Sequence, residues 1–569
     1  MTKLDRNINT LTDTEFDLIV VGAGIFGACA TWEAARRGLK VALLEKTDFA
    51  HATSANHFKM VHGGIRYIQH GDLARIRESA HERSALLRIA PHLVRPLPII
   101  IPTYGHGIKG KEILWTAMRL FDLLTWDRNR GLLPEKNIPA STIITRSQIL
   151  KLFPGIKTKG LTGGALFYDG QMVSPTRLVI SFLRSAAACG AAVANYVEVT
   201  DFERSENRVQ AVIAKDGLSG KPLTVRGKMV LNTAGPWANR LLESALGIHL
   251  EPRPTFSRDL AFVVPKRLSG PYALAFATES KDQDTLLDRG GRHLFAVPWK
   301  NFTLIGVWHK VFKESPDHIT VSTDEMRAFV EEVNAGYPGL NLDVDKVHLI
   351  NTGLTLFGDE GHQAQGGMSF GKRSMLIDHR QTHGLQGLLS LIGVRATTAR
   401  GMSQKAIDQV FRSLGRPVIP SDTATTPIYG GDISDMAEFT RDVTDSLDGL
   451  LSHDRIQLLI QHYGTGILNV LRYGSNRREL LSPVKDTGVI KAEIVHAVRE
   501  EAALGLTDVV FRRTDLATGH LPEMDVLHDC ACTMADELGW DQTRIQEEVD
   551  NVIRQFPHLY YKFRNGASK

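Results

Sequence analysis

The stretch FDLIVVGAGIFG, residues 16–27, joins an apolar run to a G-x-G-x-x-G turn. The apolar run predicts a buried strand, and the residues after the turn predict a helix to residue 37 and a second strand over residues 39–44. A strand, a glycine-rich turn, a helix and a strand in this order are typical of the βαβ unit that binds a dinucleotide. We therefore expect a Rossmann-like α/β domain in this part of the chain.

The glycines of this turn have separate roles in a dinucleotide site. Gly22 permits the tight turn, Gly24 lets the backbone approach a pyrophosphate, and Gly27 permits close contact between helix and strand. The first turn of the helix offers N–H groups and a partial positive charge to phosphate. Glu45 ends the second strand, where a carboxylate can hydrogen-bond the ribose diol. The other cofactor contacts expected in this region are Ile25, Phe26 and Lys46.

Two later features favour FAD over a nicotinamide cofactor. A nicotinamide dehydrogenase would continue with further βαβ units, but a polar turn over residues 48–54 follows instead. A strand that runs into a turn of small residues, NTAGPW at 232–237, comes much later in the chain. Flavoproteins that assemble their FAD domain from distant segments have this arrangement. The alternative is a βαβ unit with a glycine turn and no ligand.

The chain has 569 residues, too many for one hydrophobic core, so we expect two or three domains. Its formal net charge is +4 and it has no lysine- or arginine-rich block, so no nucleic-acid partner is expected. The four cysteines lack the spacing of a metal site and fit a reducing cytoplasm, with Cys29 and Cys189 as buried thiols. No metal is therefore expected.

The N-terminal residues lack the apolar core of a signal peptide, and no apolar run is long enough to span a membrane, so we expect a cytoplasmic protein. Residues 109–128 combine Trp115, Met118, Phe121 and Trp126 with basic residues, as do helices that lie in a membrane interface. Two interpretations stay open for this helix. It attaches the protein peripherally to the inner face of the cytoplasmic membrane, or it buries its apolar face on the protein.

Several motifs together resemble one family. HGGIRY at 62–67, ATS at 52–54, TTAR at 397–400 and YGTGILNVL at 463–471 join GAGIFG and NTAGPW in a set that extends over most of the chain from residue 15 onward. The set resembles the FAD-dependent glycerol-3-phosphate dehydrogenases, within the D-amino-acid-oxidase-like flavoproteins. The resemblance implies oxidation of a CH–OH group, most simply of glycerol 3-phosphate to dihydroxyacetone phosphate, with electrons passed to quinone or another acceptor.

The resemblance also implies a set of flavin and substrate contacts. Gly63 and Gly64 would let the backbone pass close to the flavin ring, where a Cβ would clash. Arg66 and Tyr67 would point across the flavin at the substrate, or else only satisfy loop carbonyls. The remaining implied cofactor contacts are Thr53, Ser54, Lys59, His62, Val197, Thr233, Ala234, Gly235, Trp237, Gly353, Arg395, Ala396, Thr397 and Thr398.

Some positions depart from the family pattern. Thr355 stands where the family has the arginine that binds phosphate, and Ala261 stands where it has a histidine near the reacting carbons. His309 ends a G-V-W-H segment in place of G-T-T-D. Arg373 and Arg395 are the arginines left to form an anion site. Oxidation of an amine, an amino acid or a 2-hydroxy acid therefore stays open, as does a non-catalytic FAD-binding protein.

Oxidation of an alcohol by flavin requires a base for the hydroxyl proton and groups that hold the substrate. We expect Arg66 and Arg395 to hold a polyol or polyol-phosphate substrate, with Tyr67 as a hydrogen-bond donor. His62 and His309 are the candidate bases, although a histidine in an apolar strand often only satisfies its neighbours. A membrane quinone and a homodimer stay open as partners.

The expected fold is an α/β FAD-binding Rossmann-like domain with an interleaved mixed or antiparallel β-sheet substrate domain, followed by a C-terminal α-helical domain. The helical pattern is clearest over residues 490–506. The expected boundaries are 15–410 for the oxidoreductase part (FAD-binding segments about 15–95, 165–255 and 355–410; substrate segments about 96–164 and 256–354), 411–435 for a linker and 436–564 for the helical cap.

Overall fold

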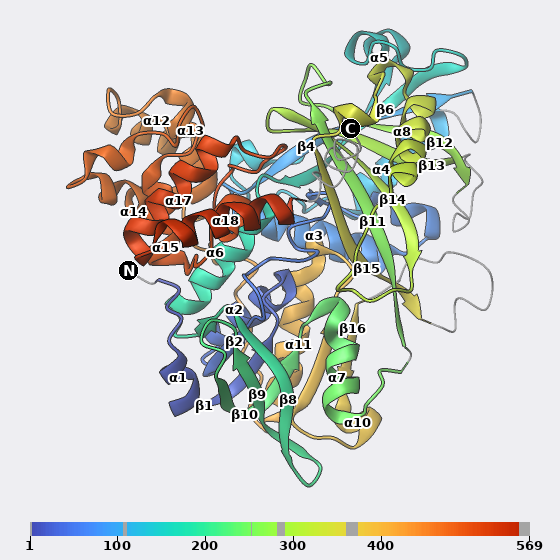
Figure 1. The fold of residues 1–569 in the computed structure, drawn as a ribbon. Helices are drawn as coiled ribbons and strands as arrows, with labels where there is room; N and C mark the ends of the chain where they lie inside the picture. Colours follow the sequence, from blue (N-terminus) through green and yellow to red (C-terminus); the bar gives the residue numbers. More distant parts are fainter. Residues whose placement is uncertain (1–2, 106–110, 252, 282–290, 360–373, 557–569) are drawn as a thin grey trace.

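Two β-sheets and a C-terminal group of helices make up the protein (Figure 1). The structure is a computed structural model, and it describes residues 3–105, 111–251, 253–281, 291–359 and 374–556. In the view of Figure 1, the first sheet occupies the lower part, the second sheet the upper right and the C-terminal helices the upper left. This architecture confirms the predicted fold class.

The first sheet contains the predicted βαβ unit. Its strands are β1 Glu15–Val21, β2 Val41–Leu44, β7 Ala192–Ala194, β8 Val197–Ser205, β9 Arg208–Asp216, β10 Pro222–Asn232, β16 Met375–Asp378 and β17 Leu388–Ile392. β1 pairs in parallel with β2 on one side and with β10 on the other, and β10 pairs in parallel with β17. The carboxyl ends of these four strands therefore meet at one edge of the sheet.

Helices cover both faces of this sheet. The helices that contribute to its two cores are α1 Ile8–Asp13, α2 Ile25–Arg36, α6 Pro175–Ala188, α7 Ala238–Leu246 and α11 Ala399–Ser413. Side chains from α2, α6 and α11 share one core with the sheet, and side chains from α1 and α7 share the other. β1 is consequently buried beyond its first residue, as its unbroken apolar run predicts.

The second sheet is almost entirely antiparallel, with one parallel pair between β4 and β12. Its strands are β3 Met60–Val61, β4 Val94–Tyr104, β5 Thr142–Thr145, β6 Leu161–Met172, β11 Pro254–Pro265, β12 Ala273–Lys281, β13 Gly291–Trp299, β14 Phe302–Phe312 and β15 Leu349–Asp359. The strand order β15-β11-β14 places three segments that are distant in sequence side by side. The helices α3 Leu73–Ile89, α4 Lys111–Leu124, α5 Arg146–Leu152 and α8 Thr323–Gly336 complete this half and its junction with the first sheet. The short helix α10 His379–His383 joins β16 to β17 of the first sheet.

The C-terminal helices form two small cores with α15 between them. They are α12 Met436–Ser446, α13 His453–Tyr463, α14 Ile467–Leu471, α15 Lys491–Glu501, α16 Leu506–Asp508, α17 Met524–Leu538 and α18 Gln542–Gln555. The prediction of one helix over residues 490–506 was too long, because Ala502 adopts a positive φ and ends α15. None of the helices in the described ranges is both long and apolar enough to cross a bilayer.

Buried ion pairs join these helices to the first sheet. Arg513 donates two hydrogen bonds to the Asp48 carboxylate, at 2.7 and 2.8 Å, and Arg512 donates another. Asn195 donates to the same carboxylate at 3.0 Å. Asp48 lies in the polar turn that follows β2. The C-terminal part of the chain therefore forms buried ion pairs with the turn that is expected to contact the cofactor.

Cys189 is exposed, and the prediction of a buried thiol there was wrong. The residue is the C-cap of α6, and its small neighbours do not cover the end of the helix. Cys29 is buried within α2, as predicted.

Candidate active site

A cavity of about 2620 Å³ opens where the carboxyl ends of the parallel strands face the second sheet. Val21, Leu44 and Ile392, the last residues of β1, β2 and β17, line one side of it. Asp259 of β11 and His309 of β14 line another. Ligands of open α/β sheets bind at this edge. The cavity therefore joins the glycine turn to polar side chains of the second sheet.

The glycine turn is packed so closely that larger residues do not fit. Gly22 has a φ of +98°, and a Cβ added there would lie 2.9 Å from the carbonyl oxygen of Thr233. A Cβ on Gly27 would lie only 1.9 Å from the carbonyl oxygen of Gly22. The hydroxyl of Thr233 closes the turn by donating to the carbonyl of Val21 at 2.8 Å. Gly22 and Gly24 line the cavity, so the backbone before α2 borders the space that a pyrophosphate would occupy.

Glu45 lies one residue beyond β2 in the cavity wall. Its carboxylate accepts hydrogen bonds from the backbone N–H of Ala23 at 2.7 Å and of Thr47 at 3.0 Å. Burial raises the pKa of this carboxyl group, while these hydrogen bonds act in the opposite direction. The carboxylate is thus held at the strand end, where a ribose diol would meet it.

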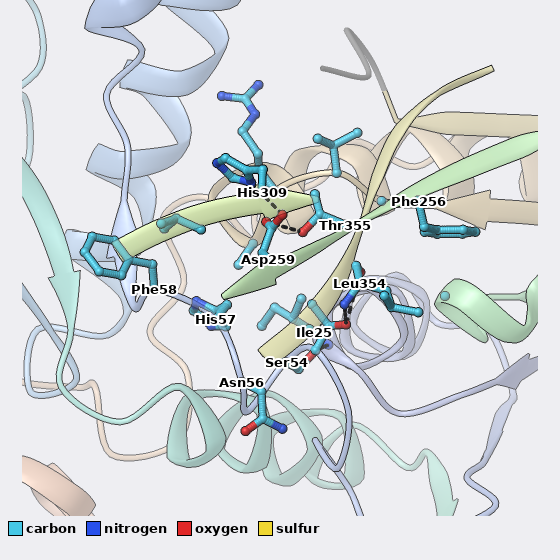
Figure 2. Close-up of a pocket in the computed structure, with 18 of the residues that line it drawn as sticks. Ile25, Ser54, Asn56, His57, Phe58, Phe256, Asp259, His309, Leu354 and Thr355 are labelled. Carbon is cyan, nitrogen blue, oxygen red and sulfur yellow. Dashed lines mark hydrogen bonds and ion pairs between the residues drawn. The ribbon is translucent and has the colours of Figure 1, made fainter. Parts of the chain in front are cut away.

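Thr53 and Ser54 connect the α2 terminus to the second sheet, and Figure 2 labels Ser54 together with Ile25 and Leu354. The Ser54 hydroxyl accepts from the N–H of Ile25 at 2.9 Å. The Thr53 hydroxyl donates to the carbonyl of Leu354 and accepts from its N–H, both at 3.1 Å. A Cβ on Gly353 would lie 3.0 Å from the Thr53 side chain. This polar turn therefore brings β15 beside the expected cofactor.

His62 and Gly63 contact one carboxylate. Asp169 lies 3.2 Å from His62 Nδ1 and accepts from the Gly63 N–H at 2.6 Å. Its other partner is the buried Arg83, at 3.1 Å. A Cβ on Gly63 would lie 2.2 Å from the Arg83 guanidinium. A side chain at 63 would therefore displace the Arg83 guanidinium, whereas Gly64, with a φ of +89°, borders the cavity itself.

Lys59 is buried behind the cavity wall. Its ammonium group donates to Asn351 Oδ1 at 3.1 Å and lies 4.6 Å from the centre of the Trp299 ring. Burial lowers the pKa of Lys59 to about 7.

Tyr67 lies against two guanidinium groups at the cavity wall. The Cζ atoms of Arg395 and Arg75 are 5.0 and 4.8 Å from the centre of its ring. Arg75 forms an ion pair with Asp72 at 2.6 Å, and Arg395 donates to the Ser79 hydroxyl at 2.8 Å. Within the described residues, no carboxylate lies within ion-pair distance of Arg395. A cavity that presents this cation suits an anionic ligand.

Asp259 connects three strands of the second sheet (Figure 2). One carboxylate oxygen lies 2.6 Å from His309 Nδ1, and the other accepts from the Thr355 hydroxyl at 2.8 Å. All three side chains line the cavity. Sequence reasoning identified His309 but missed Asp259 and Arg75, because neither belongs to a motif and only the tertiary structure shows their neighbours.

The predicted site residues fall into three groups. Those in the cavity wall are Gly22, Gly24, Ile25, Phe26, Glu45, Lys46, Thr53, Ser54, His62, Gly64, Tyr67, Val197, Thr233, Ala234, Gly235, Trp237, His309, Gly353, Arg395, Ala396 and Thr397. Those that lie behind the wall are Gly27, Lys59, Gly63 and Thr398. The side chain of Arg66, the whole of Arg373, and residues 109 and 110 of the predicted interfacial helix lie outside the described residues.

The parallel sheet, the glycine cradle and the carboxylate of Glu45 fit the pyrophosphate and ribose of a dinucleotide, and with the mixed second sheet they define an FAD-dependent oxidoreductase. The family model described as FAD dependent oxidoreductase matches residues 17–365, and that of the C-terminal domain of alpha-glycerophosphate oxidase matches residues 421–545. The chain belongs to the FAD-dependent glycerol-3-phosphate dehydrogenase family. These findings confirm the resemblance and the prediction of FAD.

Relatives match over nearly the whole chain. Glycerol-3-phosphate dehydrogenase of Synechocystis sp. is 32% identical over 98% of both chains. Glycerol-3-phosphate dehydrogenase 2 of Mycobacterium tuberculosis is 30% identical over 95% of this chain and 88% of its own. The solved glycerol-3-phosphate dehydrogenase from Bacillus halodurans, complexed with FAD, has a TM-score of 0.76 and 22% identity over 97% of this chain and 96% of its own.

Proposed function

We propose that this protein oxidises the secondary CH–OH group of glycerol 3-phosphate to the ketone of dihydroxyacetone phosphate. The observation that carries the proposal is that one cavity joins the glycine cradle of α2 to Tyr67, His309 and Arg395. The names of the full-length relatives supply the substrate. FAD, when bound, supplies the two-electron oxidation.

The side chains at the wall supply binding and proton transfer. Arg395 binds the phosphate group of the substrate through its guanidinium, and the Tyr67 hydroxyl donates a hydrogen bond. His309 accepts the hydroxyl proton. His62 is the weaker candidate for this role, because Arg83 already neutralises its partner Asp169.

A substrate comparison tests this proposal. The purified flavoprotein is mixed without oxygen with glycerol 3-phosphate, glycerol, 2-hydroxy acids or amino acids, and the loss of the oxidised-flavin absorption is timed. Glycerol 3-phosphate is expected to react with the highest second-order rate constant, and glycerol with a much lower one, since glycerol lacks the anion that Arg395 binds. Preferential reaction of any other compound would contradict the proposed substrate.

Oxidation of a 2-hydroxy acid is the second candidate. The observation that favours it is Thr355, a neutral side chain engaged with Asp259 at a position where the family places a phosphate-binding arginine. The Arg395 guanidinium can by itself donate two parallel hydrogen bonds to the carboxylate of a 2-hydroxy acid. The same comparison separates the two candidates.

We also propose that α4 attaches the protein to a membrane and that a quinone is the electron acceptor. Met118 and Phe121 of α4 are buried on the protein, whereas Trp115 is 46% and Leu123 69% exposed, and Trp126, in the turn just after α4, is 76% exposed. Helices with exposed aromatic and aliphatic side chains of this kind lie in membrane interfaces. Met118 also lines the cavity, as do Leu114 and Ala117 of α4, so the same helix connects the outer surface to the site.

Replacing both tryptophans of this surface tests the attachment. Trp115→Glu/Trp126→Glu is expected to abolish co-flotation with anionic liposomes, because each carboxylate would have to enter the interface. Leu218→Glu, at a position that is 55% exposed on the turn between β9 and β10, is the control and should float like the wild type. Equal flotation of all three proteins would remove the membrane proposal.

A further inference from the structure

We propose that Asp259 is a positioning residue that holds His309 in the orientation and tautomer of a proton acceptor, and that Thr355 fixes Asp259 in turn. The inference rests on the proposed function, in which His309 receives the hydroxyl proton of the substrate. It adds two residues, from two other strands, to the group that controls this proton transfer.

Strand register brings the three residues together. In the antiparallel pair of β11 and β14, Asp259 lies directly opposite His309. On the other side of β11, Asp259 lies opposite Gly353, so Thr355 is its diagonal neighbour on β15. The arrangement thus depends on backbone pairing on both sides of the central strand, which sets the position of each side chain.

Hydrogen bonds then fix the carboxylate. Asp259 Oδ1 lies 2.6 Å from His309 Nδ1 and accepts from the Ser257 hydroxyl at 3.0 Å. Asp259 Oδ2 accepts from the Thr355 hydroxyl at 2.8 Å. Both oxygens are engaged, and the carboxylate and imidazole side chains are only 23% and 19% exposed. Rotation of the carboxylate would break at least one of these bonds.

The charge of Asp259 acts on His309. Among the described residues, the ion pairs of Asp259 comprise only the one with His309. A carboxylate at Nδ1 places the Nδ1–H towards itself, which leaves Nε2 as the basic nitrogen of the neutral ring. It also stabilises the imidazolium that forms when the ring takes up a proton.

The proton transfer balances within the proposed oxidation. The O–H bond of the substrate breaks and its proton bonds to His309 Nε2. The C–H bond of the same carbon breaks as well, and the electron pair left on oxygen closes the carbonyl. FAD, when bound, would accept the hydrogen of that C–H bond as a hydride equivalent. Leu354 precedes Thr355 in the chain, and its backbone forms two hydrogen bonds with Thr53. Thr53 is one of the expected cofactor contacts. The Asp259–His309 pair therefore borders the end of the cavity where the flavin contacts are expected.

Asp259→Asn tests the inference by rapid anaerobic mixing with glycerol 3-phosphate. The variant keeps the shape of the side chain but loses the charge and favours the wrong tautomer. The limiting rate constant of flavin reduction is expected to fall about 10²- to 10⁴-fold, with little change in substrate Kd or FAD content. Asp259→Glu, which restores the carboxylate, is expected to recover part of the rate. Glu243→Gln, which alters the ion pair of Glu243 with the exposed His249, is the control and should react like the wild type, because neither residue lines the cavity.

Three further outcomes are decisive. A limiting rate constant within about threefold of the wild type would overturn the inference while leaving the proposed function intact, because the expected loss is at least about 10²-fold. If Asp259→Asn does not retain FAD, the variant Thr355→Val replaces it as the test, because it removes only the hydroxyl that donates to Asp259 Oδ2. An unchanged limiting rate constant of flavin reduction in Thr355→Val overturns the inference. Failure of every CH–OH compound to reduce the wild-type flavin would overturn the proposed function and this inference with it.

Discussion

Asp48→Asn is expected to lower the free energy of unfolding by about 3 to 5 kcal/mol, because it leaves two buried guanidinium groups without their shared carboxylate. Asp48 is 1% exposed, and the side chains of Arg512 and Arg513 are 4% and 0% exposed. The measurement is the shift of the urea unfolding transition of the purified holoprotein.

The effect of pH on this difference follows from the charge of Asp48. Burial alone would raise its pKa, but Arg513 and Arg512 hold the pKa well below the usual range. A carboxylate with a depressed pKa stabilises the fold fully above its unfolded pKa of about 3.9 and loses that contribution as the pH falls through the folded pKa. The difference between wild type and Asp48→Asn should therefore stay constant from about pH 8 to pH 5 and shrink below about pH 4.

An exposed aspartate supplies the matched control. Asp324 also pairs with an arginine, Arg327, at 3.0 Å, but its side chain is 90% exposed. Asp324→Asn is expected to change stability by less than about 1 kcal/mol. If Asp48→Asn shifts the unfolding transition no more than this control, the C-terminal helices are not held to the first sheet in the way described above.

Arg395→Ala is expected to lower kcat/KM for glycerol 3-phosphate by about 30- to several-thousand-fold, which corresponds to roughly 2 to 5 kcal/mol for the loss of a partner in a buried charge pair. Arg395 lines the cavity without a carboxylate partner among the described residues, so its charge is available to the substrate anion. The measurement is the rate of anaerobic flavin reduction over a range of substrate concentrations.

Two comparisons make this prediction specific. Reaction with glycerol, which has no phosphate, should change far less, so the preference for glycerol 3-phosphate over glycerol should collapse in the variant. Arg412→Ala removes an exposed arginine of α11 and should leave both reactions unchanged. An equal loss for glycerol and glycerol 3-phosphate would show that Arg395 acts on the cofactor or on the fold and not on the phosphate.

The dinucleotide half of the site could be predicted from the sequence because its parts are neighbours in the chain. The apolar strand, the glycines and Glu45 lie within one βαβ unit, where period and spacing determine the geometry. The structure differs from the prediction only in the bounds of the helix. α2 begins at Ile25, because Gly24 is its N-cap. The preference for FAD followed from the polar turn after the βαβ unit and from the strand and turn that end at residues 232–237. The C-terminal helices followed from their helical periodicity, and the family resemblance added to both predictions.

The substrate half could not be predicted in the same way. Asp259, His309 and Thr355 come from three separate strands, and their contacts depend on the register of β11 with β14 and β15. A single sequence does not fix such a register. Arg75 gave no signal either, because its position against Tyr67 depends on how α3 packs beside the 3₁₀ helix Ile65–His70. The sequence also did not predict the surroundings of Gly63, whose lack of a side chain leaves space for the Arg83 guanidinium behind the wall.

A single-turnover titration tests the central claim most directly. The FAD-containing protein is titrated without oxygen with glycerol 3-phosphate, and both the oxidised-flavin absorption and dihydroxyacetone phosphate are measured. The account predicts that the flavin is bleached and that one molecule of dihydroxyacetone phosphate forms for each flavin reduced. A bound flavin that dithionite reduces but that glycerol 3-phosphate leaves oxidised at saturating concentration would contradict it.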